Sequence, residues 1–230
     1  MIASIVPAGV QVAESTGPLP GEALLPEEEV LVARAVGRRR AEFTTGRTCA
    51  RIALGRLGLP PAPLLSGPKR EPLWPAGVVG SITHCDGYRA AAVARVTEIA
   101  AIGIDAEPHD PLPDGILDRV TLPAERAHLG ELPPGVHWDR LLFSAKESVY
   151  KAWFPLARRW LGFEDAALLF VPGAEPERGT FTADLVVDPL PVVAGQPVRT
   201  LHGRYAVSGG LLGTAITLAA DRGEEDPWRR

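Results

Sequence analysis

Residues 78–96 read VVGSITHCDGYRAAAVARV, and this stretch decides the fold class. Two runs rich in valine, isoleucine, threonine and alanine, residues 78–85 and 88–96, flank Asp86-Gly87. An Asp-Gly pair between two such runs is a strong hairpin signal, because both residues tolerate the positive φ of a tight turn. The stretch therefore predicts a pair of antiparallel strands.

Both halves of the chain place helices before strands. A helical region is predicted from Pro26 to Leu57, opened by the acidic PEEEV, and the hairpin and a third strand-like run, residues 99–107, follow it. A second helical stretch is predicted from Asp118 to Trp160. The strand-like runs after it are residues 166–172, 181–189, 202–208 and 211–219, with Gly209-Gly210 joining the last two.

This order predicts an α+β fold with two similar subdomains related by a pseudo-two-fold axis. Each would be a small antiparallel sheet packed with helices. We place the boundary at the start of the loop PHDPLPDG, so that the subdomains are residues 1–108 and 109–230. A cleft between such halves is a common position for a ligand, and we expect the active site there.

Composition excludes several classes of protein. The 230 residues carry 46% hydrophobic side chains, a net charge of −4 and a pI of 5.8, so no global basic field favours nucleic-acid binding. No apolar run approaches the roughly 18 residues of a membrane span, and the N-terminus lacks the basic start of a secretion signal. Cys49 and Cys85 have neither metal-ligand spacing nor the density of a disulfide scaffold. We expect a cytoplasmic protein that binds neither nucleic acid nor membrane.

Asp105 and Glu107 are two residues apart in the strand-like run IAAIGIDAE. Successive side chains of a strand point to opposite faces, so these two carboxylates share a face. Two oxygen ligands at a strand end suit Mg²⁺, which is typically held by one or two carboxylates together with substrate phosphates and water. The alternative is two solvated charges at a sheet edge, because D-x-E is a short and frequent pattern.

Residues 141–153, LLFSAKESVYKAW, carry more charge than an amphipathic helix requires. Glu147 and Lys151 are four apart and so lie on one face, nearly opposite an apolar stripe. Two structural interpretations stay open at this point: a surface ion pair, or a capping box that begins at Ser144 and ends at Glu147. The apolar stripe consists of Val149, Trp153, Leu156 and Trp160.

Lysine is scarce in this chain. Of the 24 lysines and arginines, three are lysine, namely Lys69, Lys146 and Lys151, which leaves 21 arginines for routine surface charge. A compact ammonium serves as a point charge against phosphate or as a proton donor where a guanidinium would not. The scarcity therefore favours a functional interpretation of these three residues.

Further candidates for an anion site are basic residues of the first half. Arg38, Arg39, Arg40 and Arg47 lie in the first helical region, and His84 lies near the end of the first hairpin strand. Since the net charge is negative, an anionic ligand would need such a local cluster. The alternatives are a solvated arginine face and a histidine that is satisfied at a strand end.

The motifs GSITHC, IGIDAE and FSAKESVYKAW, in this order and with these separations, resemble the signature of the 4'-phosphopantetheinyl transferases. The upstream RRRAEFTTGRTCARIALGRLG and GPKREPLWPAGVVGS are similar to the large monomeric class that activates nonribosomal peptide and siderophore synthases. The resemblance covers about residues 38–165. A lone D-x-E is weak evidence, but D-x-E followed about 40 residues later by F-S-x-K-E-S-x-x-K is strong.

The resemblance implies an enzyme that transfers the phosphopantetheine arm of coenzyme A to a serine of a carrier protein and releases adenosine 3',5'-bisphosphate. It implies Mg²⁺ as cofactor, a monomer, and carrier domains of peptide, polyketide or fatty-acid synthases as partners. Residues 122–138 are a candidate carrier contact. A non-catalytic module that binds carriers or nucleotides, and a Mg²⁺-dependent phosphodiesterase acting on coenzyme A, remain alternatives.

Matching motif positions also imply roles for single residues. The catalytic residues would be Asp105, Glu147 and Lys151, with Glu147 as the base, directly or through a metal-bound water, and Lys151 assisting the leaving group. The Mg²⁺ ligands would be Asp105, Glu107 and Glu147. The residues that contact coenzyme A would be Arg39, Arg47, Lys69, Thr83, His84, Lys146 and Lys151.

Two details of this assignment stay open. Arg40 could take the place of Arg39, because one sequence cannot set the register within the triple arginine. Lys69 is separated from Pro72 by two residues, whereas many relatives carry a compact Gly-x-Lys-Pro. The contacts to the 3'-phosphate are therefore left open.

Overall fold

A computed structural model describes residues 1–188, 190–193 and 196–220; Pro189, in a predicted strand, and residues 221–230, in the predicted second subdomain, lie outside the described residues. The helices are α1 (Pro26–Glu29), α2 (Gly37–Arg56), α3 (Leu117–Val120), α4 (Pro123–Leu129) and α5 (Trp138–Ala157), with short 3-10 helices η1 (Ile2–Ser4), η2 (Val30–Val32) and η3 (Phe163–Asp165). The strands are β1 (Gln11–Ser15), β2 (Val78–Cys85), β3 (Tyr88–Arg95), β4 (Ile99–Pro108), β5 (Ala166–Pro172), β6 (Arg178–Leu185), β7 (Leu190–Val193), β8 (Gln196–Val198), β9 (Thr200–Ser208) and β10 (Leu211–Ala219).

The hairpin predicted at Asp86-Gly87 is confirmed. β2 and β3 pair antiparallel along their whole length, and Gly87 has a φ of 73°. β1 pairs with the other edge of β3, which gives a three-stranded sheet in the order β1-β3-β2. The predicted α+β class, with antiparallel sheets and packed helices, is likewise confirmed.

β4 does not extend this first sheet. It pairs antiparallel with β10, with Asp105 opposite Thr214, in a five-stranded sheet of order β4-β10-β9-β6-β5. β9 and β10 form the second predicted hairpin, and Gly209 and Gly210 of its turn both have positive φ. β4 ends at Pro108, within the predicted first subdomain, but belongs to the sheet of the second half, so the division at 108/109 stays a prediction.

Two hydroxyl groups on β2 join the two sheets. The backbone N–H groups of Ile104 and Ala106 on β4 donate to Ser81 Oγ at 3.1 Å and to Thr83 Oγ1 at 3.0 Å. Both hydroxyl side chains are buried. In a continuous sheet, backbone carbonyl groups of a neighbouring strand would accept from these β4 N–H groups. Here the two hydroxyl groups accept instead. The contact sets Thr83 beside Asp105, because Thr83 Oγ1 also lies 3.2 Å from Asp105 Oδ1.

α5 packs against β4 at very short range. A Cβ placed on Gly103 would lie 1.9 Å from the carbonyl oxygen of Ser148 on α5. The Ser148 hydroxyl in turn lies 2.6 Å from Thr214 Oγ1 on β10. Glycine at position 103 is therefore what lets the helix backbone approach the strand. Buried α5 side chains in this half of the core include Leu141, Ala145, Val149, Ala152 and Trp153.

Both predicted helical regions are interrupted. Residues 26–57 contain α1, η2 and α2, and the stretch from Asp118 to Trp160 contains most of α3, together with α4 and α5. The second interruption, between α4 and α5, includes Pro133-Pro134-Gly135, and Gly135 has a φ of 103°. Proline lacks the backbone donor that a helix requires and disfavours helical geometry in the residue before it. Each predicted helical region therefore contains several separate helices.

The position of Ser144 within α5 excludes the capping-box interpretation. α5 begins at Trp138, so Ser144 lies in its second turn and is fully buried. Its Oγ lies 2.9 Å from Thr214 Oγ1 on β10. The hydroxyl therefore joins the helix to the sheet and does not begin the helix.

The predicted apolar stripe holds within the helix and fails beyond it. Val149 and Trp153 are buried, whereas Trp160 is 71% exposed. α5 ends at Ala157, and Arg158 at its C-terminus has a left-handed φ of 52°. The prediction was wrong at Trp160 because helical spacing no longer applies there.

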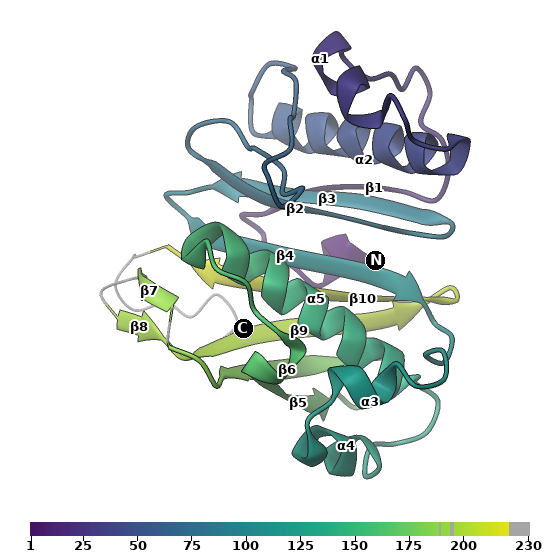
Figure 1. Cartoon of the computed structure of the whole chain (residues 1–230), viewed down its shortest axis with the longest axis vertical. Helices are drawn as coiled ribbons and strands as arrows, with labels where there is room; N and C mark the ends of the chain where they lie inside the picture. The colour runs from purple at the N-terminus through teal and green to yellow at the C-terminus, as the bar shows by residue number, and fades with distance from the viewer. Residues whose placement is uncertain (189, 194–195, 221–230) are drawn as a thin grey trace.

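Figure 1 shows α2 along the outer face of the three-stranded sheet and α5 across the five-stranded sheet. α1 lies at one end of the molecule, and α3 and α4 lie at the other. Within residues 1–188, 190–193 and 196–220, no helix is long and apolar enough to cross a membrane.

We predict that Gly103→Ala destabilises the protein by about 1–3 kcal/mol, the usual cost of overpacking a tight interface. The added methyl group would force α5 away from β4, because the atom it meets is a helix carbonyl that cannot rotate aside. Urea unfolding followed by circular dichroism measures the change.

Gly55→Ala in α2 is the matched control. Among the described residues, no heavy atom lies within 4 Å of a Cβ at this position apart from its chain neighbours and its own helix backbone. Alanine there should stabilise the helix by roughly 0.5–1 kcal/mol. Equal effects of the two substitutions would contradict the account of the α5 interface.

Candidate active site

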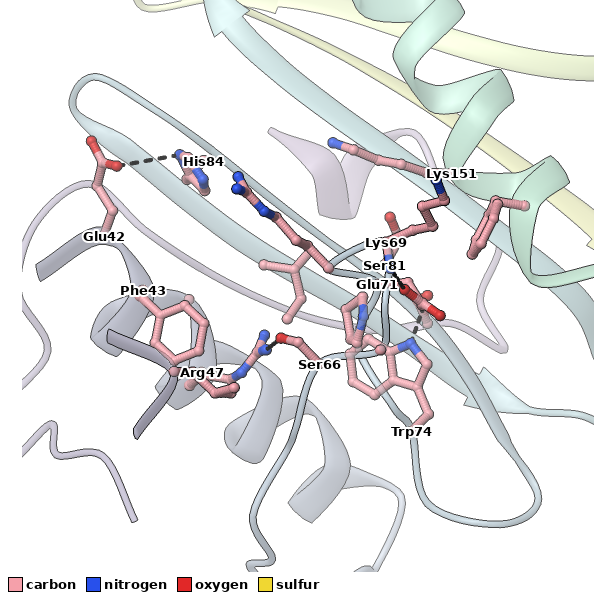
Figure 2. Close-up of a pocket in the computed structure, with 18 of the residues that line it drawn as sticks. Glu42, Phe43, Arg47, Ser66, Lys69, Glu71, Trp74, Ser81, His84 and Lys151 are labelled. Carbon is pink, nitrogen blue, oxygen red and sulfur yellow. Dashed lines mark hydrogen bonds and ion pairs between the residues drawn. The ribbon is translucent and has the colours of Figure 1, made fainter. Parts of the chain in front are cut away.

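A cavity of about 570 Å³ lies between α2, the loop of residues 66–74, β2 and α5. Its walls come from both halves of the chain, and Figure 2 shows side chains from these elements around one space. Six predicted site residues line it: Arg39, Arg47, Lys69, His84, Glu147 and Lys151.

Arg47 is a buried cation in the cavity wall. Its Nη2 donates to Ser66 Oγ at 2.9 Å, and its guanidinium lies 4.3 Å from the ring centroid of Phe43. Burial lowers the pKa of Arg47 to about 10, so it still carries its charge at neutral pH. Its Nε is buried and has no hydrogen-bond partner among the described residues. An unpaired buried donor on a cation favours an anionic ligand.

His84 lies between a cation and an anion. Arg39 Nη1 is 2.6 Å from His84 Nε2, and Glu42 Oε2 is 3.7 Å from His84 Nδ1 (Figure 2). Because a guanidinium only donates, Nε2 accepts and the ring is neutral with its proton on Nδ1. Burial first, and then the charge of Arg39, lowers the pKa of His84 below its ordinary value. An anion near Nε2 would reverse this balance by favouring the protonated ring.

The structure separates the neighbouring arginines of the triple arginine. Arg39 lines the cavity, whereas Arg40 Nη2 binds Glu29 Oε2 at the end of α1. Arg38 is exposed and lies 3.7 Å from Glu42. The geometry therefore favours Arg39 over Arg40 as the residue that faces a ligand.

The loop that carries Lys69 turns back on itself. The Glu71 carboxylate accepts a hydrogen bond of 2.9 Å from the Lys69 backbone N–H. Gly67 leaves room for this carboxylate, since a Cβ there would lie 2.2 Å from Glu71 Oε1. Arg70 between them has a left-handed φ of 67°, and Arg158, just after α5, lies 3.5 Å from Glu71. The two residues that separate Lys69 from Pro72 thus make the turn that brings Lys69 to the cavity.

Lys151 connects the cavity to the carboxylates of β4. Its Nζ lies 2.7 Å from Asp105 Oδ1 and donates to the carbonyl oxygen of Ile104 at 3.1 Å. Asp105 is 5% exposed, and its Oδ2 is buried without a hydrogen-bond partner in the described part of the chain. A buried carboxylate oxygen without a donor is costly, which favours a cation at this point.

Glu147 and Glu107 both respond to the charge of Asp105. Burial, followed by Asp105, raises the pKa of Glu147, while Lys151 opposes the rise. Burial and Asp105 likewise raise the pKa of Glu107, while Arg140 opposes it from a distance of 3.1 Å. The charge of Asp105 therefore acts on both glutamates, and a cation bound near Asp105 would oppose this repulsion. Even so, the described residues contain no group of three or more His, Cys, Asp or Glu side chains arranged to hold a metal ion.

The structure does not bring every predicted residue to the large cavity. The lining, as far as the chain is described, omits Thr83, Asp105, Glu107 and Lys146. The Thr83 hydroxyl accepts from β4, as described above. Lys146 instead forms a buried ion pair with Glu125 of α4, and its predicted contact with coenzyme A stays a prediction.

A smaller cavity of about 130 Å³ adjoins the large one. The two share Glu147 and Tyr150, and the smaller one is also lined by Lys146 and Trp160. Trp160 and Tyr150 have ring centroids 5.1 Å apart, so this space has aromatic walls.

The lining residues that sequence reasoning missed include Glu42, Phe43 and Tyr150. Helical spacing could have found two of them. Phe43 is four residues before Arg47, and Tyr150 is three residues after Glu147, so each lies on the same face as a predicted site residue. Nothing in the sequence indicates that Glu42 lies beside His84, because they are 42 residues apart.

Comparison with known families assigns both halves of the chain to one family. Residues 27–94 match a family model for the 4'-phosphopantetheinyl transferase N-terminal domain, and residues 101–190 match the model for the 4'-phosphopantetheinyl transferase superfamily. The chain is 52% identical to the 4'-phosphopantetheinyl transferase PptT of Mycobacterium tuberculosis over 223 residues, which covers 95% of this chain and 98% of that protein.

The chain belongs to the 4'-phosphopantetheinyl transferases. The 4'-phosphopantetheinyl transferase Svp of Streptomyces mobaraensis is 53% identical over 229 residues, 97% of this chain and 91% of Svp. Enterobactin synthase component D of Salmonella typhimurium is 40% identical over 126 residues, 52% of this chain and 50% of that protein. The protein is therefore a transferase.

We predict that Glu147→Gln stabilises the metal-free transferase at pH 7 by about 1 kcal/mol, a common gain when a functional site is relaxed. The folded pKa of Glu147 lies above its ordinary value of 4.5. Its ionised form therefore lowers the free energy of unfolding above the folded pKa and has no effect below 4.5, where both states are protonated. Urea unfolding in a chelator at several pH values measures the difference.

The exposed Glu175→Gln is the control, and it should change neither the stability nor its pH dependence. A Glu147→Gln variant that is less stable than the wild type at pH 7 would contradict the described electrostatics.

Proposed function

We propose that this transferase moves the 4'-phosphopantetheine arm of coenzyme A to a serine hydroxyl of an apo carrier protein and releases adenosine 3',5'-bisphosphate. The observation that carries the proposal is the continuity of the cavity. It joins a cluster of basic residues to Lys151, and Lys151 is paired with the buried Asp105. Coenzyme A has a phosphorylated nucleotide at one end and a pyrophosphate that reacts. The basic cluster suits the first group, and Lys151 with Asp105 suits the second.

Arg39, Arg47, Lys69 and His84 bind the phosphates of coenzyme A in this proposal. They all line one cavity, and the net charge of −4 means that such attraction is local. Arg47 is the residue we assign to the 3'-phosphate, because its buried Nε has no partner among the described residues. Charge-assisted hydrogen bonds of this kind are about twice as strong as neutral ones.

Asp105, Glu107 and Glu147 would hold a Mg²⁺ ion. The partnerless Oδ2 of Asp105 and the raised pKa values of the two glutamates support this choice. Oxygen-only ligands are what Mg²⁺ prefers. When bound, the ion neutralises charge on the pyrophosphate as a Lewis acid.

The chain's own residues then move one proton and support one leaving group. Glu147, whose pKa is raised by burial and by Asp105, takes the proton of the serine hydroxyl as a general base. The serine oxygen bonds to the phosphorus that carries the pantetheine arm, and the bond from that phosphorus to the oxygen of the adenosine bisphosphate breaks. The Lys151 ammonium stabilises the negative charge that this oxygen acquires.

The partners are acyl or peptidyl carrier domains, and the relatives named enterobactin synthase component D support a role in peptide or siderophore synthases. We propose a monomer, because both walls of the cavity come from one chain. We further propose two subdomains, 1–108 and 109–230, and a cytoplasmic location, which two free cysteines support.

We predict that the protein, a fluorescent coenzyme A analogue and Mg²⁺ label the serine of an apo carrier domain. Glu147→Gln and Asp105→Ala should each lower the labelling rate by at least about 100-fold, since each removes a group that acts in the transition state. Asp105→Ala should also weaken the dependence on Mg²⁺. Mass spectrometry of the carrier detects the added arm.

The exposed Glu175→Gln should label at the wild-type rate. Failure to label a panel of carriers from fatty-acid, polyketide and peptide synthases would overturn the proposal. Coenzyme A binding without transfer would then favour a binding module, and bisphosphate release without any carrier would favour a phosphodiesterase.

We predict that Arg47→Met lowers the affinity for coenzyme A about 10- to 100-fold, the value of a charged hydrogen bond. It should leave the affinity for 3'-dephospho-coenzyme A unchanged, because that molecule lacks the phosphate assigned to Arg47. Isothermal titration calorimetry measures both affinities.

Arg40→Met, one residue from Arg39 but outside the cavity lining of the described chain, is the matched control and should bind both ligands like the wild type. If Arg47→Met weakened both ligands equally, the 3'-phosphate assignment would be wrong.

A further inference from the structure

Lys146 and Glu125 form an almost solvent-free ion pair between α5 and α4. Lys146 Nζ lies 2.9 Å from Glu125 Oε2, and the two side chains are 3% and 2% exposed. The same ammonium donates to the carbonyl oxygens of Phe163 and Ala166. An ammonium has three donors, and these three acceptors use all of them. A phosphate contact would have to break one of these bonds.

Glu125 is equally engaged. Its Oε2 accepts from the backbone N–H of Leu122 at 2.7 Å, and its Oε1 accepts from the N–H of Leu168 at 2.8 Å. Leu122 precedes the first residue of α4, and Leu168 lies on β5. The pair therefore ties α4, β5 and α5 together through charged, directional bonds.

Stability alone does not account for such a pair. Removing two charges from water is costly, and well-packed apolar side chains of the same volume are often at least as stable. A well-attested use of buried polar groups is to select one register between packed elements. In this protein, the ion pair would select one rotation of α5 about its own axis.

Glu147 follows Lys146 directly on α5. Successive side chains of an α-helix point about 100° apart, so holding Lys146 against α4 also sets the direction of Glu147. Lys151, one turn after Glu147, shares that rotation and lies 2.7 Å from Asp105. A rotation of α5 would move Glu147 and Lys151 together away from β4.

We propose that Lys146 is a positioning residue, whose ion pair with Glu125 sets the rotation of α5 that presents Glu147 and Lys151 to the carboxylates of β4. This inference rests on the proposed function, because it concerns the residues to which that function assigns the base and the leaving-group contact. Lys146 acts through Glu147 and touches neither coenzyme A nor the carrier.

The test compares Lys146→Met, Glu125→Gln and the double variant in the carrier-labelling assay, at a temperature where circular dichroism shows all of them folded. Each single substitution should lower kcat about 10- to 100-fold, as expected when reacting groups are displaced by a fraction of an ångström to one ångström. The KM for coenzyme A should change less than about threefold, because no ligand contact is lost. The double variant should be no worse than the worse single variant, because the two residues act as one unit.

Arg178→Met is the matched control for loss of a positive charge, since Arg178 is exposed on β6 away from the pair, and its kcat should equal that of the wild type. If Lys146→Met fails to fold, Glu125→Gln carries the test, because glutamine keeps the size of the side chain.

Three outcomes would overturn the inference. A raised KM for coenzyme A in Lys146→Met alone, with normal Glu125→Gln, would make Lys146 a phosphate contact. Lower melting temperatures with wild-type kcat would make the pair merely structural. Crystal structures of the wild type and Lys146→Met give a readout without catalysis, and an unmoved Glu147 carboxylate would overturn it too. If the wild type itself labels no carrier, the proposed function fails, and the crystal structures still decide whether the pair orients Glu147.

Discussion

The contact between Gly103 and the carbonyl oxygen of Ser148 is the constraint on which the site depends. A side chain on Gly103 would meet that oxygen at 1.9 Å, so only glycine lets the backbone of α5 lie directly on β4. Lys151 follows Ser148 by less than one helical turn, and Asp105 follows Gly103 by two residues. Lys151 Nζ lies 2.7 Å from Asp105 Oδ1. The close approach of the two backbones and this ion pair thus occur within three residues of each other on both elements.

The second requirement is that the two sheets meet at the same strand. Ser81 and Thr83 on β2 accept hydrogen bonds from backbone N–H groups of β4, and the cavity lies where β2 and α5 both approach this region. β4 therefore serves both halves: its backbone pairs with β10, and the N–H groups of Ile104 and Ala106 donate to hydroxyls of β2. A single strand carries Asp105 to the junction.

The resulting site is unfavourable for the folded chain without its ligands. Asp105 Oδ2 and Arg47 Nε are buried without partners among the described residues, and the pKa values of Glu107 and Glu147 are raised by burial and by Asp105. Such costs persist at functional sites because the surrounding packing holds the groups in place. The Lys146–Glu125 pair belongs to that surrounding packing, since all three Lys146 donors and both Glu125 oxygens have partners.

The sequence by itself determined the hairpin at Asp86-Gly87, the α+β class and the motif that joins Asp105 to Glu147 and Lys151. These are local features, set by turn chemistry, by alternation and by helical spacing. Only the tertiary structure decided that β4 pairs with β10, that Arg39 and not Arg40 faces the cavity, and that Lys146 turns to Glu125. Each of these depends on which distant residue fills the space beside it, and the partner of β4 lies about 100 residues further along the chain. Short-range patterns carry no information about such partners, because burial and pairing arise only when the elements pack.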